Sequence, residues 1–402
     1  MLISFDQQIQ LFSRRCERIL SEDDLRRKLE KSARTGQPLR IKFGMDPTAP
    51  DVTLGHAVPM KVIRQFQELG HKAVLIIGDY TARVGDPSGR NTTRPVLSGG
   101  QIDANAKTYV DQIGKILLTD PAHLEVRWNG EWLGAMNLVD LIKLASRKSV
   151  AQMLERDSFK ERFEAGGDIR IHEFLYPLLQ GWDSVVIEAD VEMGGNDQLF
   201  NNLVGREFQK QEGKDPQVVM VTPILVGTDG TMKMSKSKGN YISVTDPPSG
   251  ADGMFGKIMK LPDALMENYY TLLTDLPAEQ ITAEIQSNPR SAKAELAKSI
   301  ITWLHDAAAA ELAEAEFVKT THGGVPDEMP EFPAAPGPQQ LGPLLVASGL
   351  AASNSEAMRK MREGAVKIDG QKASDPAVKY SFDRPAVLQL GNRKFARIIP
   401  SK

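Results

Sequence analysis

Short apolar runs alternate with helix-patterned segments through much of the chain, and this alternation restricts the possible folds more than any other feature. Residues 73–79 form an apolar run that ends at Gly78 and Asp79, as expected for a buried strand of a parallel sheet. Residues 218–221 and 224–226 are predicted as two further buried strands. Helical patterns cover 58–69, 103–118, 138–146, 150–164 and 292–317. The sequence therefore predicts an α/β fold with a doubly wound parallel sheet.

A strand–loop–helix segment near the N-terminus has the layout of a phosphate-binding site. The apolar run at 39–43 leads into Gly-Met-Asp-Pro-Thr at 44–48, and Thr-Leu-Gly-His at 53–56 precedes the helix pattern at 58–69. Backbone N–H groups and the positive end of a helix dipole attract phosphate at such a helix start. A single histidine there is more often a polar cap than a phosphate ligand, so this segment alone is weak evidence.

A second cationic segment reads Lys-Met-Ser-Lys-Ser at 233–237 and lies in a glycine-rich stretch. The nearby glycines predict a mobile loop that carries two lysines. Alone, such a loop is most often a solvated surface. The two segments, in this order and with strands and helices between them, indicate a polyphosphate held between both ends of one domain.

Together the two segments resemble the signature motifs of class I aminoacyl-tRNA synthetases, which join an amino-acid carboxylate to the α-phosphate of ATP and release pyrophosphate. The resemblance implies ATP as a substrate, accompanied by Mg²⁺. No Cys/His spacing suggests a zinc site, and no protein-bound metal is expected. Because the carboxylate nucleophile is already anionic, the protein has to align the reactants and neutralise charge on the leaving pyrophosphate.

This resemblance implies roles for the polar residues of both segments. Lys233 and Lys236 are expected at the β- and γ-phosphates, because a mobile loop can close on them as the transition state forms. His56 is expected to donate to the α/β-phosphate region. The motif of the class usually reads His-x-Gly-His, and Thr53 takes the place of the first histidine, so it supplies a hydrogen bond but no charge. The other expected nucleotide contacts are Gly44, Gly55, Asp46 and Thr48, the last two with the substrate amino group as an alternative.

Three polar side chains share one face of a predicted helix. Tyr176, Gln180 and Asp183 are spaced i, i+4, i+7, which aligns them along the helix. A half-exposed polar helix face would have the same spacing. Two further polar segments, Gly-Asp-Pro-Ser-Gly-Arg at 85–90 and Gly-Gly-Asn-Asp-Gln at 194–198, accompany them. The first follows the strand predicted at 73–79, where a carboxylate can face a cleft at the carboxyl end of the sheet.

With these segments the chain resembles the tyrosyl-tRNA synthetase family, in its bacterial branch with a compact C-terminal domain, over nearly its whole length. The resemblance implies that Asp86, Tyr176 and Gln180 hold the α-ammonium of L-tyrosine. Asp183 is expected to accept a hydrogen bond from the phenolic hydroxyl. A site built to hydrogen-bond a hydroxyl rejects the analogue that lacks it by roughly 10⁴–10⁵, so Asp183 is expected to discriminate tyrosine from phenylalanine.

The same resemblance places Gln198 at the substrate carboxylate and the nucleotide, and Asp197 at the ribose of ATP. Arg90 and Arg94 are expected at pyrophosphate, with exposed surface arginines as an equally weighted alternative. Many family members have a tyrosine at the position of Lys42, where it makes a second contact to the phenol. That contact is therefore either missing here or supplied differently.

The composition fits a soluble cytoplasmic protein. The one cysteine, Cys16, excludes an internal disulfide and indicates a reducing compartment. The N-terminus lacks the apolar run of a signal peptide, and no segment approaches the ~20 apolar residues of a membrane span. A cytoplasmic location without a membrane partner is expected.

The C-terminal segment is basic although the chain as a whole is acidic. Residues 341–402 contain 11 Lys and Arg against 5 Asp and Glu, a net charge of +6, so the other 340 residues carry −9. A capping-box pattern at 353–356 starts a helix that a glycine at 364 ends. This segment resembles an S4-type RNA-binding domain, and Arg359, Lys360 and Arg362 are expected to contact tRNA(Tyr), although a small domain can also be basic by chance.

The expected organisation has four parts. Residues 1–232 form the Rossmann-type catalytic domain, with an insertion at about 100–195 that forms the interface of a homodimer, as the family resemblance implies. Residues 233–320 form the lysine loop and a helical domain on the anticodon side. Residues 321–340 are a proline-rich linker, and residues 341–402 form a small α+β S4-like domain.

The predicted function is tyrosine–tRNA ligase: formation of tyrosyl-adenylate, then transfer of tyrosine to the 3′-terminal adenosine of tRNA(Tyr). A tryptophanyl-tRNA synthetase would not be expected to have the polar helix face or the S4-like tail. A cofactor adenylyltransferase is usually far shorter and lacks an RNA module. A non-enzymatic RNA-binding descendant would be expected to have lost the site residues, which are present here apart from those at positions 42 and 53.

Overall fold

The chain is organised as two units, one of Met1–Thr245 with Pro262–Ser287 and one of Asp246–Leu261 with Asn288–Lys402. The computed structural model describes residues 3–87, 99–250, 252–321, 324–326, 329–335, 337–391 and 394–401. The turn at 85–90 is therefore described only as far as residue 87, and Arg90 and Arg94 lie outside the described residues.

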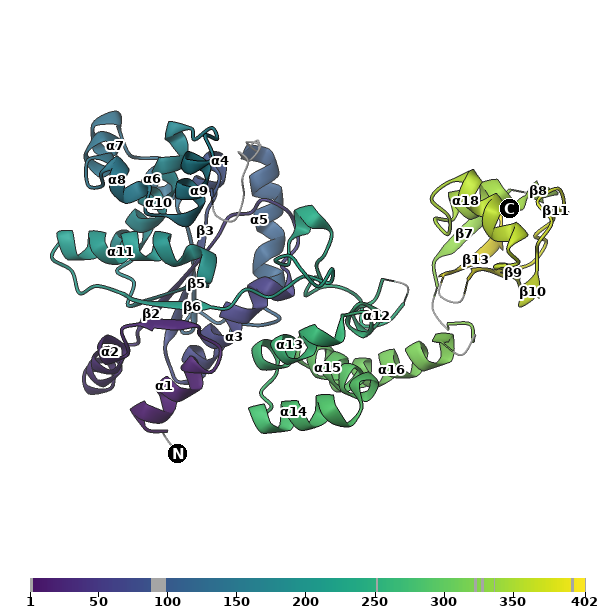
Figure 1. The fold of residues 1–402 in the computed structure, drawn as a ribbon, viewed down its shortest axis with the longest axis horizontal. Helices are drawn as coiled ribbons and strands as arrows, with labels where there is room; N and C mark the ends of the chain where they lie inside the picture. The colour runs from purple at the N-terminus through teal and green to yellow at the C-terminus, as the bar shows by residue number, and fades with distance from the viewer. Residues whose placement is uncertain are drawn as a thin grey trace. The chain divides into compact units, whose positions relative to one another are not determined.

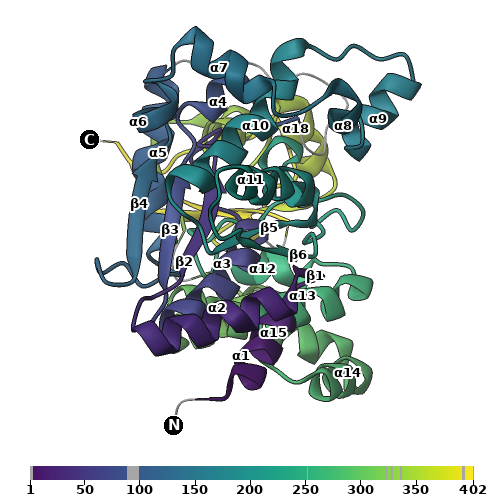
Figure 2. The same cartoon turned by 90° about the vertical axis from the view of Figure 1, so that its left-hand side faces the viewer.

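A six-stranded sheet lies in the first unit (Figure 1). Its strand order is β1-β6-β5-β2-β3-β4. Neighbouring strands from β6 to β4 are parallel, and the edge strand β1 is antiparallel to β6. Figure 2 shows β2, β3 and β4 side by side. The strands are β1 (Arg18–Leu20), β2 (Arg40–Met45), β3 (Lys72–Ile77), β4 (Leu124–Trp128), β5 (Val191–Gly195) and β6 (Val218–Thr222).

The strand order confirms the doubly wound sheet expected from the sequence. The chain proceeds outward from β2 through β3 to β4, then returns to the other side of β2 and proceeds from β5 to β6. The order therefore reverses between β2 and β5, and ligands of such sheets bind beside this reversal, at the carboxyl ends of the strands.

Helices connect and cover these strands. Helix α3 (Leu54–Glu68) joins β2 to β3, and its Phe66 stacks on Phe12 of α1 with 3.8 Å between ring centroids. The other helices of this unit are α1 (Phe5–Ser13), α2 (Glu22–Thr35), α4 (Thr81–Val84), α5 (Gly99–Ile113), α6 (Gly130–Leu133), α7 (Leu138–Ala145), α8 (Val150–Met153), α9 (Asp157–Glu164), α10 (Ile171–Val186), α11 (Leu199–Gln211), α13 (Met266–Leu273) and α14 (Ala278–Ser287), with the 3₁₀ turns η1 (Asn196–Gln198), η2 (Lys236–Lys238) and η3 (Asp263–Leu265).

Helices α10 and α11 approach closely because each has a glycine at the contact. A Cβ on Gly181 would lie 2.8 Å from Val204 Cγ1, and a Cβ on Gly205 would lie 2.6 Å from Ser184 Oγ. Both distances are shorter than a side chain tolerates. The two glycines thus set the position of α10, the helix that carries the predicted polar face.

Three elements differ from the sequence prediction. The helix expected at 150–164 is broken into α8 and α9, because the chain turns at Arg156, whose guanidinium is buried beside the Phe159 ring. The strand expected at 224–226 forms only an isolated bridge, Val226 to Lys233, after Pro223, which has no N–H to donate to a ladder. The helix expected at 292–317 is two helices, because the Asp306 carboxylate accepts from Ala309 N–H (2.7 Å) and caps a new one.

The second unit contains helices α12 (Met254–Met259), α15 (Pro289–Leu304) and α16 (Ala307–Thr321). Phe255 of α12 and Phe317 of α16 pack with their ring centroids 5.2 Å apart. Lys298 of α15 is paired with Glu311 and Glu314 of α16, at 2.8 and 3.2 Å. Apolar contact and ion pairs together hold these helices against one another.

A C-terminal module, residues 331–401, has its own sheet and core. Five strands lie in the order β10-β9-β12-β13-β7, and β11 pairs with β8. Buried Leu345, Met361 and Leu388 belong to one apolar cluster. The elements are β7 (Glu331–Ala334), β8 (Gln339–Gln340), α17 (Leu341–Ala347), α18 (Asn354–Arg362), β9 (Val366–Ile368), β10 (Gln371–Lys372), β11 (Lys379–Tyr380), β12 (Ala386–Leu390) and β13 (Lys394–Pro400).

The linker predicted at 321–340 is shorter than expected. Strand β7 lies inside that range and pairs in parallel with β13, and β8 pairs with β11. Proline is tolerated on an edge strand, so Pro333 does not prevent β7 from joining the sheet. Counting prolines therefore overestimated the linker at its C-terminal side.

Candidate active site

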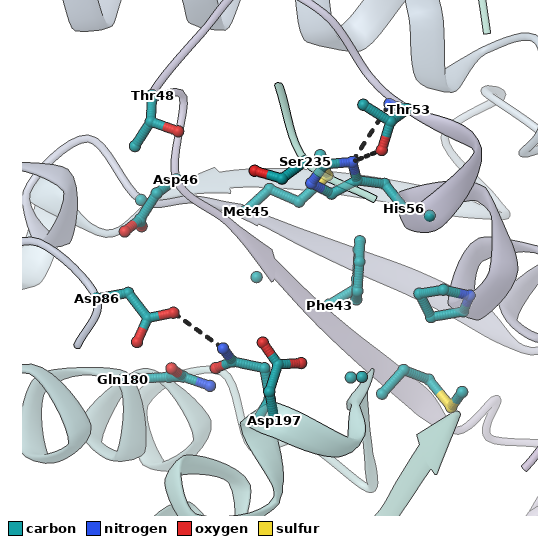
Figure 3. Close-up of a pocket in the computed structure, with 18 of the residues that line it drawn as sticks. Phe43, Met45, Asp46, Thr48, Thr53, His56, Asp86, Gln180, Asp197 and Ser235 are labelled. Carbon is teal, nitrogen blue, oxygen red and sulfur yellow. Dashed lines mark hydrogen bonds between the residues drawn. The ribbon is translucent and has the colours of Figure 1, made fainter. Parts of the chain in front are cut away.

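A cavity of about 590 Å³ opens at the carboxyl ends of β2 and β5, where the strand order reverses. Figure 3 shows side chains of Asp46, Asp86 and Asp197 around it, from three different segments. The structure brings all fourteen described residues predicted for the two substrates to this cavity. They are Gly44, Asp46, Thr48, Thr53, Gly55, His56, Asp86, Tyr176, Gln180, Asp183, Asp197, Gln198, Lys233 and Lys236.

His56 is held by the N-terminus of α3. Thr53 N–H donates to His56 Nδ1 (3.2 Å), and Thr53 Oγ1 lies 2.7 Å from the same nitrogen (Figure 3). Because a backbone N–H can only donate, Nδ1 is an acceptor and the proton of the neutral ring is on Nε2. Burial, with Lys236 and Lys233 nearby, lowers the pKa of His56 to about 3. His56 is thus a neutral N–H donor at the cavity, and Thr53 fixes its tautomer.

The segment that follows the lysine loop is hydrogen-bonded to the start of α3. Leu54 N–H donates to the Ile242 carbonyl at 2.9 Å, and Thr53 forms a bridge with Ser243. Asn240 organises the loop from within: its Oδ1 accepts from Ser235 N–H (2.8 Å), and its Nδ2 donates to the Lys233 carbonyl (3.1 Å). The two segments expected to bind phosphate therefore form one hydrogen-bonded assembly.

Each lysine of the loop contacts a different side of the cavity. Lys233 Nζ lies 2.6 Å from Asp197 Oδ2. Lys236 Nζ donates to Tyr109 OH (3.0 Å) and to the Ala49 carbonyl (3.2 Å), and lies 5.2 Å from the centroid of the Tyr109 ring. Burial lowers the pKa of Lys236 to about 8. Sequence reasoning missed Tyr109, because nothing in the local pattern of α5 marks its hydroxyl as a partner of a distant lysine.

Asp46 follows β2 and lies at the end of the cavity where the residues predicted to bind the amino acid gather, here called the amino-acid end. Its two carboxylate oxygens accept from Tyr176 OH at 2.9 Å and from Thr81 Oγ1 at 2.8 Å. A Cβ on Gly78 would lie 2.1 Å from Asp46 Oδ1. The close packing at this glycine fixes the carboxylate, so Asp46 orients Tyr176.

A chain of amide side chains links Gln180 to Asp86. Asn201 Nδ2 donates to Gln180 Oε1 and to Gln198 Oε1, both at 2.9 Å. Gln198 Nε2 in turn donates to Asp86 Oδ2 at 2.9 Å. Asn201 is fully buried and was not predicted from the sequence. It fixes which way both glutamine amides face.

Asp183 is buried at the amino-acid end of the cavity. Its carboxylate accepts from Trp132 Nε1 at 2.8 Å and from Asn129 Nδ2 at 3.2 Å. Burial raises the pKa of Asp183 to about 7, and the attraction of Lys42 and the two hydrogen bonds limit that rise. Both donors follow the end of β4, so the position after a buried parallel strand was the signal that could have found them.

Lys42 does not line this cavity. Its ammonium is buried between β2, β5 and α10, where it pairs with Glu192. No group of three or more His, Cys, Asp or Glu side chains among the described residues is arranged to hold a metal ion. In the same part of the chain, no helix is long and apolar enough to cross a membrane.

The three basic residues predicted for RNA contact lie together on α18 of the C-terminal module, in its last turn. Arg359 is exposed and donates to Glu363 Oε1 at 3.1 Å, and Lys360 donates to Glu363 Oε2 at 2.9 Å. Arg362 is exposed on the same turn. The helix therefore presents a basic end to solvent.

The sequence matches the model of a known enzyme family. Residues 34–321 match the family model described as tRNA synthetases class I (W and Y). The chain belongs to this family. The tyrosine–tRNA ligase of Bordetella avium is 50% identical over 396 residues, which cover 97% of this chain and 95% of the relative. That of Colwellia psychrerythraea is 48% identical over an alignment of 408 positions, which covers 100% of both chains.

Solved structures share the fold of this class I synthetase at lower identity. The tyrosyl-tRNA synthetase of Archaeoglobus fulgidus, complexed with L-tyrosine, has a TM-score of 0.62 at 23% identity and covers 76% of this chain and 99% of its own. A C-terminally truncated mitochondrial tyrosyl-tRNA synthetase of Aspergillus nidulans has a TM-score of 0.63 at 24% identity and covers 79% and 94%. These likenesses support the Rossmann-type assignment of the catalytic fold.

Proposed function

We propose that this synthetase is a tyrosine–tRNA ligase. It activates L-tyrosine with ATP to tyrosyl-adenylate and pyrophosphate, then transfers tyrosine to the 3′-terminal adenosine of tRNA(Tyr). One observation carries the proposal. Asp183, a buried carboxylate that can accept a hydrogen bond from a hydroxyl, lines the same cavity as a helix N-terminus and two loop lysines. A tyrosine whose phenol reaches Asp183 can present its carboxylate to a nucleotide held by the loop.

In the first step the carboxylate attacks the α-phosphorus, and the bond to the pyrophosphate oxygen breaks. No proton has to be removed from the nucleophile, so alignment and charge neutralisation are the tasks of the protein. Lys233 and Lys236 neutralise the leaving pyrophosphate, and His56 donates from Nε2 to the α/β-phosphates. Mg²⁺ enters with the nucleotide, because it prefers phosphate oxygens and water to an all-protein cage.

Recognition of the amino acid uses the polar face of α10 and the residues around it. Asp86, Tyr176 and Gln180 hold the α-ammonium, Gln198 contacts the carboxylate, and Asp197 contacts the ribose. Gly44, Gly55 and Thr48 contribute close backbone or hydroxyl contacts to the nucleotide. The Asp183 carboxylate accepts a hydrogen bond from the phenolic O–H, so phenylalanine would leave a buried acceptor unpaired. This acceptor favours tyrosine over tryptophan, the other amino acid that the family serves.

The C-terminal module is the proposed tRNA-binding part, through Arg359, Lys360 and Arg362. Its support is the exposed basic end of α18 and the net charge of +6 at 341–402 on an otherwise acidic chain, because phosphate contacts are made largely by lysine and arginine. Helices α15 and α16 are proposed as the anticodon-side domain. The cytoplasm remains the expected location.

A homodimer is proposed through the segment at about 100–195. Large apolar side chains are exposed along α7 to α10, as expected of an interface. They are Leu138, Val139, Ile142, Val150, Phe163 and Ile171, each at least 58% exposed. Light scattering that gives the mass of one chain at micromolar concentration would contradict this part of the proposal.

A charging assay tests the proposed function in full. The purified protein, ATP, Mg²⁺ and tRNA(Tyr) are incubated with labelled tyrosine, and label in acid-precipitable tRNA is counted. We expect charging that depends on ATP and is lost in the variant Lys233→Ala/Lys236→Ala. Efficient charging of tRNA(Trp) with tryptophan, and none with tyrosine, would overturn the choice of amino acid while leaving the family assignment intact.

A further inference from the structure

The buried ion pair Lys42–Glu192 adjoins the amino-acid end of the cavity and has no part in the chemistry described above. The Lys42 side chain on β2 is 0% exposed and that of Glu192 on β5 is 2% exposed, with 2.8 Å between Nζ and Oε1. Lys42 Nζ also donates to the Gln180 carbonyl (2.9 Å) and to Ser184 Oγ (2.7 Å). Each of the three N–H groups of the ammonium therefore has an acceptor.

Glu192 is equally well satisfied. Ser184 Oγ donates to Oε2 at 3.0 Å, Gln217 Nε2 donates to the same oxygen, and Gln180 Nε2 lies 3.3 Å from Oε1. Ser184 thus accepts from Lys42 and donates to Glu192. The pair is the centre of a closed hydrogen-bond network that joins β2 and β5 to α10.

Stability alone does not account for this pair. Two charges lose their hydration on burial, and apolar side chains of similar volume in the place of a buried pair are often neutral or stabilising. The network is instead directed at one turn of α10. Gln180 and Ser184, which Lys42 binds, are one turn apart and flank Asp183, the proposed acceptor of the phenol.

The charged groups that act on Asp183 come from the two central strands. Lys42 of β2 attracts its carboxylate, and Glu192 of β5 repels it. The neutral side chains Trp132 and Asn129 donate to it. The effect of Lys42 opposes the burial that raises the pKa of Asp183 to about 7. Near neutral pH the charge of Asp183 therefore depends on the pair beside it.

We propose that Lys42, held in place by Glu192, is a positioning residue that determines specificity for tyrosine. Its ammonium keeps the Asp183 carboxylate in the ionised form that accepts a hydrogen bond from the phenolic O–H, and its hydrogen bonds to Gln180 and Ser184 fix the turn that carries Asp183. Hydrogen bonds to an ionised acceptor are roughly twice as strong as neutral ones, so ionisation sharpens discrimination against phenylalanine. The inference rests on the proposed function, which makes Asp183 the phenol acceptor.

The test is the pH dependence of kcat/KM in amino-acid-dependent exchange of labelled pyrophosphate into ATP, between pH 5.5 and 8. The wild-type value for tyrosine should fall as the pH drops below about 7, because Asp183 is then protonated. Lys42→Met should move this fall to higher pH by about one unit. At a pH below the wild-type midpoint, that shift is about a tenfold loss in kcat/KM for tyrosine. Glu192→Gln should move it to lower pH, because a repelling charge is removed. Phenylalanine, which has no hydroxyl, should show no such pH dependence.

The opposite signs separate this role from a structural one, since damage to the fold would move both variants in the same direction. The double variant Lys42→Met/Glu192→Gln leaves no unpaired charge, so it keeps the test available if Lys42→Met does not fold, and its profile should lie between those of the single variants. Profiles of Lys42→Met and Glu192→Gln that coincide with the wild type, or shift together, would overturn the inference. A wild-type enzyme without tyrosine-dependent exchange would instead overturn the proposed function.

Discussion

Two lysines of one short loop have different surroundings, and this difference bears on their roles. Lys233 is exposed and lies 2.6 Å from Asp197, whereas Lys236 is partly buried against Tyr109. A buried ammonium is less hydrated, so its attraction to a developing charge is less weakened by solvent. Lys236 is therefore expected to contribute more to the transition state than Lys233.

Lys236→Ala should lower kcat for adenylate formation on the order of 10²-fold, the size expected for loss of one donor to a developing charge. The KM for tyrosine should stay nearly unchanged, because Lys236 makes no contact with the amino-acid end. Lys238→Ala is the matched control, since Lys238 is exposed on the same turn and does not line the cavity. Pyrophosphate-exchange kinetics of both variants give the kcat and the KM for tyrosine that test this prediction. Unchanged turnover with a raised KM for tyrosine would contradict the assignment of Lys236.

At the scale of elements, helix α5 and the segment after β2 compete with the nucleotide for Lys236. Tyr109 OH and the Ala49 carbonyl accept from the Lys236 ammonium, and the Tyr109 ring lies beneath it. Phosphate oxygens would have to replace these partners. Contacts that hold the ammonium away from phosphate raise the apparent KM for ATP.

Tyr109→Ala should therefore lower the KM for ATP by about three- to tenfold, from the loss of a cation–π contact and a hydrogen bond. The turnover number should change little. Tyr109→Phe keeps the ring and should have a smaller effect in the same direction. Steady-state exchange at varied ATP measures both constants. A fall in kcat with an unchanged KM would show that Tyr109 holds Lys236 in its working position instead.

Sequence patterns predicted the strands and helices whose apolar or polar residues recur at regular spacing along the chain. The apolar run at 73–79 gave β3, and the i, i+4, i+7 spacing placed Tyr176, Gln180 and Asp183 on α10. The break at Arg156 was missed, because burial of its guanidinium beside Phe159 is a tertiary effect that helix periodicity does not contain. The predicted residues that line the cavity are those that belong to a recognisable motif.

Residues that only orient the site residues were not found. Trp132 and Asp183 are 51 positions apart, and Lys236 and Tyr109 are 127 apart. A single sequence contains no signal for such contacts, because each partner looks ordinary in its own segment. Lys42 was noticed as a departure from the family pattern, but its partner Glu192 became evident only in the folded sheet.

At the scale of the whole molecule, synthesis of the adenylate and binding of tRNA are assigned to different parts of the chain. Every described residue proposed to touch ATP or tyrosine lies in the first unit. The C-terminal module has its own core and begins at β7, before the position 341 expected from the sequence. A deletion near residue 338 would leave β7 behind without β13, so the cut has to precede it.

A protein that ends at Thr321 should keep tyrosine-dependent exchange within about twofold of the full-length value. Charging of tRNA(Tyr) should fall at least about 100-fold at physiological salt, and its salt dependence should become shallower, because basic side chains that displace counterions are lost. Charging assays across a salt series test this, with circular dichroism as the check on folding. Equal charging with an equal salt slope would show that the module does not bind RNA.

The claim that one cavity holds tyrosine by its phenol and aligns it with ATP is tested most directly by amino-acid specificity in pyrophosphate exchange. The assay compares tyrosine, phenylalanine and tryptophan, in the wild type and in Asp183→Asn. The account predicts that tyrosine exceeds phenylalanine by roughly 10⁴ or more in kcat/KM, that tryptophan gives no exchange, and that Asp183→Asn narrows the gap to phenylalanine. Equal losses for tyrosine and phenylalanine in Asp183→Asn, or wild-type exchange driven by tryptophan, would contradict it.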